Sequence, residues 1–269
     1  MTIAGSDPSG GAGIQADLKT FSALGAYGTS VITALTAQNT TGVTGIQLIP
    51  ASFVTEQLDT LLADVRVDAI KIGMLGTREV ADAVAEFLRL HPHDVVVLDP
   101  VMVATSGDRL LTKDAVQAIR RLLPLAGLVT PNVDEAADLL DTEPAVDVNG
   151  LLEQARAILA LGAQRVLVKG GHLPGDVTDR PAIDVFVGDG LEQVLTGPWI
   201  TTSNTHGTGC TLSSAIAALR AGNPSWLAAT SAAKQWLTGA IAAADRLDIG
   251  HGHGPVHHFY RWWDQPPAG

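Results

Sequence analysis

Apolar positions along the chain repeat with two alternating periods, which predicts strands and helices that follow one another. Short apolar, often β-branched runs predict buried strands, and apolar residues at every third or fourth position predict amphipathic helices. The predicted strands are residues 1–4, 30–37, 69–73, 95–98, 128–130 and 166–168. The predicted helices are residues 14–24, 53–65, 151–161 and 212–219, two that are capped by Thr77 and Thr112, and one that begins at residues 131–135.

Repeated strand-then-helix units predict an α/β fold with a mostly parallel sheet and helices on both of its faces. Residues 41–49 alternate around two glycines and predict a short β excursion off the main sheet, near the substrate site. Residues 183–187 and 191–195 predict an antiparallel hairpin. With 269 residues, of which 46% are hydrophobic, we expect a single domain that spans 1–269.

Polar or small residues follow most of the predicted strands. In a parallel α/β sheet, ligands bind at the carboxyl ends of the strands, so these residues are expected to meet on one rim. Each of them alone is equally well explained as an ordinary turn or helix cap, but the whole set is not. The set consists of Gly5, Gln38, Met74, Asp99, Asn132, Lys169 and the loop at Gly207.

Residues 204–211 form a glycine-rich turn that runs directly into a predicted helix. Gly207 and Gly209 flank Thr208, so free backbone N–H groups are expected to converge at a helix N-terminus and to bind an anion such as phosphate. Cys210 lies in the first turn, where the helix dipole favours a thiolate and a lowered pKa. The alternative is an ordinary turn with Cys210 as a small core residue.

A second glycine-rich loop, residues 5–13, follows the first predicted strand. Its glycine spacing is that of a phosphate-binding P-loop, but Gly11 and Ala12 stand where that loop needs Lys and Ser or Thr. Residues 11–16 also fit the dinucleotide-binding fingerprint, yet the next acidic residue that could hold a ribose is Glu56, which is too distant. Neither motif is complete.

The remaining polar residues are the parts of a phosphoryl transferase. Asp99 and Glu135 could hold a hydrated magnesium ion, and Lys169 could bind a nucleotide phosphate. The N–H groups of residues 207–209 could stabilise developing charge, with Cys210 as the candidate base for an acceptor hydroxyl.

Composition excludes several other classes of protein. Lys and Arg total 17 against 28 Asp and Glu, and this net charge of −11 argues against nucleic acid as a partner. No apolar run approaches the eighteen or so residues that span a bilayer. The single cysteine excludes an internal disulfide, and we expect a cytoplasmic protein.

Together these motifs resemble the hydroxymethylpyrimidine/phosphomethylpyrimidine kinases of bacterial thiamine biosynthesis, in the ribokinase superfamily. The resemblance extends from near Met1 to the tail at 254–260. It rests on residues 4–17 (AGSDPSGGAGIQAD), 37–39 (AQN), 71–75 (KIGML), 169–172 (KGGH) and 204–210 (NTHGTGC).

The resemblance implies a ribokinase-like fold and a two-step activity. Such enzymes use ATP and Mg²⁺ to phosphorylate 4-amino-5-hydroxymethyl-2-methylpyrimidine and then its monophosphate, and a homodimer is expected. Gln38 would read the pyrimidine edge, in a substrate pocket with Gly5, Asp17, Met74 and Val101. Nucleotide binding would fall to Lys169, Asn132 and Thr208, and metal binding to Asp99 and Glu135. The anion hole would be Gly207, Thr208 and Gly209, with Cys210 where sugar kinases of this superfamily place an aspartate base.

Several alternatives stay open at this point. Pyridoxal kinases resemble the chain in fold and loops, and a non-catalytic pyrimidine sensor would keep Gln38 without needing the catalytic set. The chain starts closer to its first strand than members of the family usually do, so either that strand is shortened or the native start lies upstream of Met1. His251, His253, His257 and His258 suggest a metal site, or, as we expect, a loosely packed tail. Trp262 and Trp263 fit an anchor on the body or a subunit contact.

Overall fold

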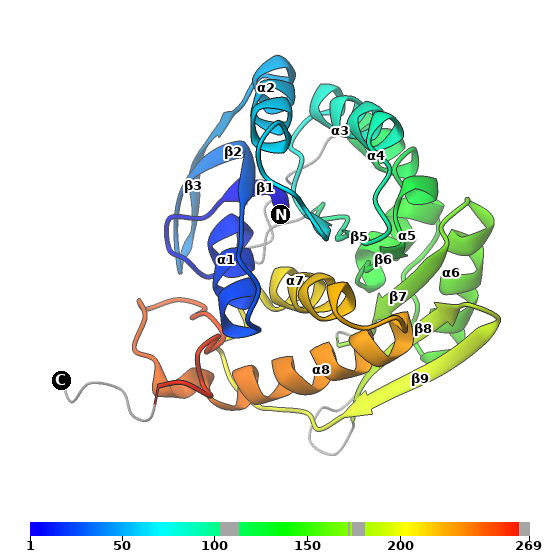
Figure 1. The fold of residues 1–269 in the computed structure, drawn as a ribbon. Coiled ribbons are helices and arrows are strands. Elements are labelled where there is room, and N and C mark those ends of the chain that lie inside the picture. The colour runs from blue at the N-terminus through cyan, green and yellow to red at the C-terminus, as the bar shows by residue number, and fades with distance from the viewer. Residues whose placement is uncertain (103–112, 172, 174–180, 264–269) are drawn as a thin grey trace.

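The computed structural model describes residues 1–102, 113–171, 173 and 181–263, so the predicted cap at Thr112 lies outside the described residues. Within them, nine strands form one sheet in the order β3-β2-β1-β4-β5-β6-β7-β8-β9 (Figure 1). The strands are β1 (Thr2–Ser6), β2 (Ser30–Asn39), β3 (Gly42–Leu48), β4 (Ile70–Ile72), β5 (Val96–Leu98), β6 (Leu128–Val129), β7 (Arg165–Lys169), β8 (Ala182–Gly188) and β9 (Leu191–Gly197).

The centre of the sheet is parallel and its two edges are antiparallel. Strands β2, β1, β4, β5, β6 and β7 pair in parallel. Strands β8 and β9 form the antiparallel hairpin that the sequence predicts. Strand β3 pairs with β2 along six residue pairs, from Ala34–Leu48 to Asn39–Gly42, and is the opposite edge of the same sheet. Because β1 pairs with β2 only as far as Leu35, β3 lies mostly beside the part of β2 that extends past β1. It is joined to the sheet as its edge strand and forms the predicted small β excursion.

Helices cover both faces of the sheet (Figure 1). Helices α2 to α6 pack in sequence on one face, and α1, α7 and α8 pack on the other. Their bounds are α1 (Gly13–Ala23), α2 (Ala51–Leu62), α3 (Arg78–Leu90), α4 (Lys113–Arg120), α5 (Val133–Leu140), α6 (Val148–Ala160), α7 (Thr208–Ala221) and α8 (Trp226–Ala242).

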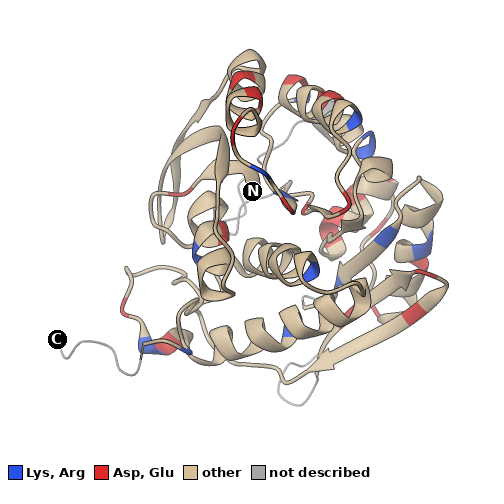
Figure 2. Ribbon diagram, viewed as in Figure 1, with Lys and Arg blue, Asp and Glu red and all other residues tan. Residues whose placement is uncertain are grey.

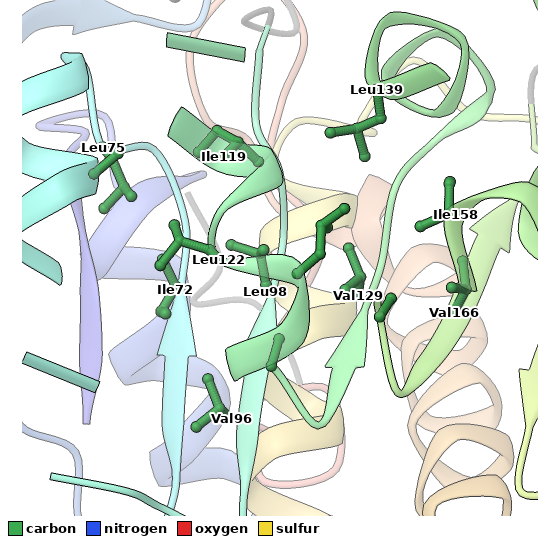
Figure 3. Close-up of a cluster of buried hydrophobic side chains, with 14 of the residues drawn as sticks. Ile72, Leu75, Val96, Leu98, Ile119, Leu122, Val129, Leu139, Ile158 and Val166 are labelled. Carbon is green, nitrogen blue, oxygen red and sulfur yellow. The ribbon is translucent and has the colours of Figure 1, made fainter. Parts of the chain in front are cut away.

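The central strands are apolar on both faces, as strands covered by helices must be. In β5, Val96 and Leu98 join the core beneath α2 to α6, whereas Val97 between them joins the core beneath α1, α7 and α8. Figure 3 shows Leu98 beside Leu122, with Ile119 of α4 above them and Ile158 of α6 farther along the same cluster, near Val166 of β7. This alternation explains why these strands occur as continuous apolar runs in the sequence.

Helix α8 is absent from the sequence-based prediction. Alanine and threonine are spread around it, so no apolar stripe marks it as an amphipathic helix. Figure 2 shows that α7 and α8 carry almost no charged side chains, in keeping with their position against each other and against the sheet. Among the described helices none is long and apolar enough to cross a membrane.

The histidine-containing segment near the C-terminus packs on the body. The side chains of His257 and His258 are 3% and 4% exposed, and His258 Nε2 lies 3.1 Å from the hydroxyl of Thr211 in α7. Burial lowers the pKa of His258 to about 3, so its imidazole is neutral. The prediction of a loosely packed tail is wrong for these two residues. Among the described residues no group of three or more His, Cys, Asp or Glu side chains could hold a metal ion.

A buried ion pair connects the centre of the sheet to α1. Lys71 of β4 donates to both carboxylate oxygens of Asp17 at 2.9 Å, and both side chains are fully buried. Asp17 also accepts hydrogen bonds of 2.6 Å from the hydroxyls of Thr2 and Ser214. One carboxylate thus joins β1, β4, α1 and α7, and its charge is neutralised by a single lysine.

Because Asp17 would lose its only salt-bridge cation among the described residues, Lys71→Met is expected to lower the free energy of unfolding by about 3–5 kcal/mol. Arg66→Met is the matched control, since Arg66 and Asp68 form an ion pair with side chains 87% and 63% exposed. That change is expected to cost less than about 1 kcal/mol. Urea denaturation of the two variants measures the difference, and equal losses would contradict the role of the buried pair.

Candidate active site

The carboxyl ends of the parallel strands open into a cavity of about 920 Å³. Residues from both glycine-rich loops line it, together with the side chains that follow β4, β5, β6 and β7. All positions that the sequence places on a common rim are brought together here: Gly5, Gln38, Met74, Asp99, Asn132, Lys169 and Gly207. They converge because parallel strands in one sheet end at the same edge.

Most of the other predicted site residues also line this cavity. Val101, Glu135, Thr208, Gly209 and Cys210 do so. The predicted substrate residue Asp17 is not part of the lining and is fully buried against Lys71, whose own side chain reaches the cavity. Asp17 therefore does not contact the cavity directly, and its ion pair with Lys71 connects it to the cavity wall.

The turn before α7 has the backbone geometry of an anion site. Gly207 has φ +75°, and a Cβ there would overlap the carbonyl oxygen of Gly11, so only glycine fits. Helix α7 begins at Thr208 without a side-chain cap. The N–H of Thr208 donates to the carbonyl of Thr205 at 3.3 Å, whereas Gly209 and Cys210 line the cavity and their amides have no capping side chain. The positive end of the helix dipole is thus directed at the cavity.

A histidine and an aspartate that the sequence analysis did not single out hold the two loops together. His206 Nε2 donates to Asp7 Oδ2 at 2.8 Å. Asp7 also accepts from the backbone N–H groups of Ser9 and Ala12, each at 2.8 Å. Although burial favours the neutral acid, the bonds from His206, from the hydroxyl of Ser9 at 2.7 Å and from the N–H of Ala12 lower the pKa of Asp7. An ionised carboxylate thus orders residues 5–13 and attaches them to the anion loop.

Cys210 lies where two helix N-termini meet. It is in the first turn of α7, and its thiol accepts a hydrogen bond from the N–H of Gly13, the first residue of α1. Burial nevertheless raises the pKa of Cys210 to about 11, with Asp17 and Asp99 adding to the effect and Lys71 opposing it. The prediction of a lowered pKa is wrong, because the cost of burying a thiolate exceeds the contribution of the helix dipole.

Next to Gly209 of the same turn, Lys169 lies between two carboxylates. Its ammonium is 2.8 Å from Asp99 Oδ1 and 3.8 Å from Glu135 Oε2. Burial of Lys169 is outweighed by these two carboxylates, which raise its pKa. Burial together with the charge of Asp99 raises the pKa of Glu135 to about 7, against the opposing effect of Lys169. Glu135 in this cluster therefore gains or loses its proton near neutral pH.

The backbone positions Glu135 at the start of α5. Asn132 Oδ1 accepts from the N–H of Glu135 at 2.8 Å, and Glu135 Oε2 accepts from the N–H of Asn132 at 2.8 Å. This capping box fixes both side chains just beyond the carboxyl end of β6. Magnesium commonly binds through one or two carboxylates and keeps several of its waters, so Asp99 and Glu135 are a suitable donor pair for it.

Comparisons with known proteins identify close relatives along nearly the whole chain. The sequence profile of the family described as phosphomethylpyrimidine kinase matches residues 7–257. Hydroxymethylpyrimidine/phosphomethylpyrimidine kinase of Escherichia coli is 56% identical, with 98% of each chain covered. The protein of the same name from Rhizobium meliloti is also 56% identical, over 98% of this chain and 97% of the relative.

Solved structures of two kinds of kinase have the same fold. Bacillus subtilis pyridoxal kinase, solved as an ADP complex, has a TM-score of 0.88 and 36% identity, with 97% of each chain covered. Phosphomethylpyrimidine kinase from Clostridium difficile has a TM-score of 0.77 and 40% identity, over 89% of this chain and 97% of that chain.

Because Cys210 is the only cysteine in the chain, its ionisation can be followed without interference. A pKa of about 11 predicts that the rate of alkylation by iodoacetamide rises about tenfold per pH unit from pH 7 to pH 10 without levelling. Cys210→Ala supplies the blank. A rate that levels below about pH 8.5, the value for a free thiol, would show that the site stabilises the thiolate.

Proposed function

The chain belongs to the phosphomethylpyrimidine kinase family, and we propose that it transfers phosphoryl groups from ATP to a pyrimidine in two steps of thiamine biosynthesis. The first acceptor is the hydroxymethyl group of 4-amino-5-hydroxymethyl-2-methylpyrimidine, and the second is the monophosphate that results. The main support is that one cavity combines an amide for the pyrimidine, an anion loop, and a lysine–carboxylate cluster.

The lysine–carboxylate cluster suits the nucleotide and its metal. Lys169 would contact a nucleotide phosphate, with Asn132 and Thr208 beside it on the cavity wall. Asp99 and Glu135 would hold Mg²⁺ through its waters, and the ion would neutralise charge on the phosphates. The raised pKa of Glu135 supports this assignment, since a carboxylate that lacks enough positive charge around it gains most from a cation.

Gln38 and three less polar residues near it would form the binding site for the pyrimidine ring. Gly5, Met74 and Val101 provide an apolar surface, and a Cβ at Gly5 would crowd the Met74 methyl group. Among the described residues that line the cavity, only Gln38 and Asn132 carry a side-chain carboxamide. The amide oxygen and nitrogen of Gln38 can pair with the exocyclic amine and the adjacent ring nitrogen.

Transfer would proceed by positioning and by neutralisation of charge. The acceptor oxygen forms a bond to the γ-phosphorus, the bond to the β,γ-bridging oxygen breaks, and ADP leaves. The N–H groups of residues 207–209 would stabilise the negative charge of the transferred group. In the first step the alcohol proton passes to the thiolate of Cys210, which must itself have lost its proton beforehand because of its raised pKa.

Exposed apolar side chains support a homodimer. Leu35, Ile46 and Leu48, on the edge formed by β2 and β3, are 45%, 45% and 43% exposed. A second copy of the chain would remove them from water.

An ADP-release assay with three acceptors tests the proposed substrate. The pyrimidine alcohol and its monophosphate are expected to be phosphorylated with a kcat/KM well above that for pyridoxal. Pyridoxal is included because several solved structures with this fold are pyridoxal kinases. A higher kcat/KM for pyridoxal than for both pyrimidines would overturn the proposed substrate class, and omission of Mg²⁺ is expected to abolish all turnover.

The two steps make different demands on Cys210. The alcohol must lose a proton, whereas the monophosphate already carries ionised oxygens near neutral pH. Cys210→Ala is therefore expected to lower alcohol phosphorylation by roughly 10²-fold or more at pH 9. Monophosphate phosphorylation should fall much less.

The pH dependence of wild-type activity provides the second measurement. Below a pKa of about 11 the thiolate fraction grows with pH, so kcat/KM for the alcohol should rise from pH 7 to pH 10. The monophosphate activity and the Cys210→Ala variant should lack this rise. A parallel loss of both activities in the variant would show that Cys210 is not the base.

A further inference from the structure

Two neighbours contact the side-chain amide of Gln38 from opposite sides. Its Oε1 lies 3.1 Å from the hydroxyl oxygen of Thr36, two residues earlier in β2. Its Nε2 lies 3.4 Å from Nε2 of His206 in the anion loop. Because the amide can rotate by 180° about its last bond and exchange these two atoms, the protons of the two neighbours decide which orientation is favoured.

The hydroxyl proton of Thr36 has a better acceptor than Gln38. Thr36 Oγ1 is 2.8 Å from the carbonyl oxygen of Ser6, which can only accept. A hydroxyl has one proton, so once Thr36 donates to Ser6 it presents lone pairs to Gln38. The group that Thr36 favours on its side of the amide is therefore the NH₂ of Gln38.

His206 offers no acceptor to the other side of the amide. Its Nε2 is bonded to Asp7 Oδ2 at 2.8 Å, and Asp7 is held ionised by its other hydrogen bonds. A carboxylate only accepts, so Nε2 of His206 carries a hydrogen whichever form the ring takes. That hydrogen is directed at Asp7, and a protonated ring nitrogen has no lone pair with which to accept from the NH₂ of Gln38. The NH₂ group is therefore disfavoured on this side, and the oxygen of Gln38 is left to face His206.

We propose that Thr36 and His206 lock the amide of Gln38 in one orientation, with Nε2 toward Thr36 and Oε1 toward His206, and so determine which pyrimidines the site accepts. The reverse orientation places two donors against each other at His206 and two acceptors against each other at Thr36. Each of these two residues is itself fixed by a hydrogen bond: Thr36 to the carbonyl oxygen of Ser6, and His206 to the carboxylate of Asp7.

The lock distinguishes two pyrimidines of nearly equal shape. A 4-aminopyrimidine offers a donor at the exocyclic position and an acceptor at the adjacent ring nitrogen. Its 4-oxo analogue offers the reverse pattern, an acceptor and then an N–H donor. A freely rotating amide pairs with both compounds, whereas an amide locked in one orientation pairs with only one of them in the same pose.

The inference rests on the proposed function, and the experiment separates the two. Wild type, Thr36→Val and Thr36→Ser are assayed with the pyrimidine alcohol and with its 4-oxo analogue. Wild type is expected to prefer the amino compound by on the order of 10²-fold or more in kcat/KM. Thr36→Val keeps the shape and the strand preference of Thr36 but removes one of the two locks. The preference should fall roughly 3- to 10-fold, because one hydrogen bond is lost and kcat/KM for the oxo analogue rises.

Thr36→Ser is the matched control, since it keeps the hydroxyl and should retain the wild-type preference. A purely structural role for Thr36 would lower both activities together and leave their ratio unchanged, which would overturn the lock. Equal ratios in Thr36→Val and Thr36→Ser would overturn it as well. If folded wild type binds ATP but phosphorylates neither pyrimidine, the proposed function itself is wrong and the inference falls with it.

Discussion

The site depends on the close approach of two loops that are about two hundred residues apart in the sequence. The imidazole of His206 bonds to Asp7, and the backbone of Gly207 lies so close to Gly11 that a side chain at either glycine would overlap the other loop. The first loop ends in α1 and the second ends in α7. Their contact therefore directs two helix N-termini toward one point, where Cys210 lies. Without this contact the anion loop would be an ordinary turn.

Charge is the second constraint, and it explains the two raised pKa values. Lys71 and Lys169 on the cavity wall face three carboxylates, those of Asp99 and Glu135 on the wall and that of Asp17 buried behind Lys71. With every carboxylate ionised the cluster has one negative charge too many. Glu135 accordingly keeps its proton up to about pH 7, and a thiolate at Cys210 would add a further negative charge beside the same groups. A bound cation would relieve both, which links the metal requirement of a kinase to the protonation of its own residues.

The sequence predicts the site better than it predicts the connections that hold it. Gln38, Asp99, Asn132 and Lys169 could be placed together because strand ends in a parallel sheet meet at one edge, a rule that needs only the order of elements. His206 and Asp7 could not be paired, since their contact joins distant segments and no local pattern marks it. The adjacency of His206 to the anion loop was the one signal available. Helix α8 was missed for a related reason, because packing rather than an apolar stripe determines its formation.

The error about Cys210 shows how a local rule fails when burial is unknown. A helix N-terminus stabilises a nearby anion by roughly 0.3–1 kcal/mol at a surface and by up to about 2 kcal/mol in a partly buried site. At Cys210 the loss of water around the thiolate, together with the charges of Asp17 and Asp99, outweighs this contribution and raises the pKa to about 11. The sequence places Cys210 in the first turn of a helix but does not show that Asp17 and Asp99 lie near it. A protonated thiol is neutral, so it can lie beside bound phosphate groups without competing with them for cations. If it acts as a base, it does so only in the small fraction of molecules that have lost the proton, so the same burial that protects the thiol limits the rate of the alcohol step.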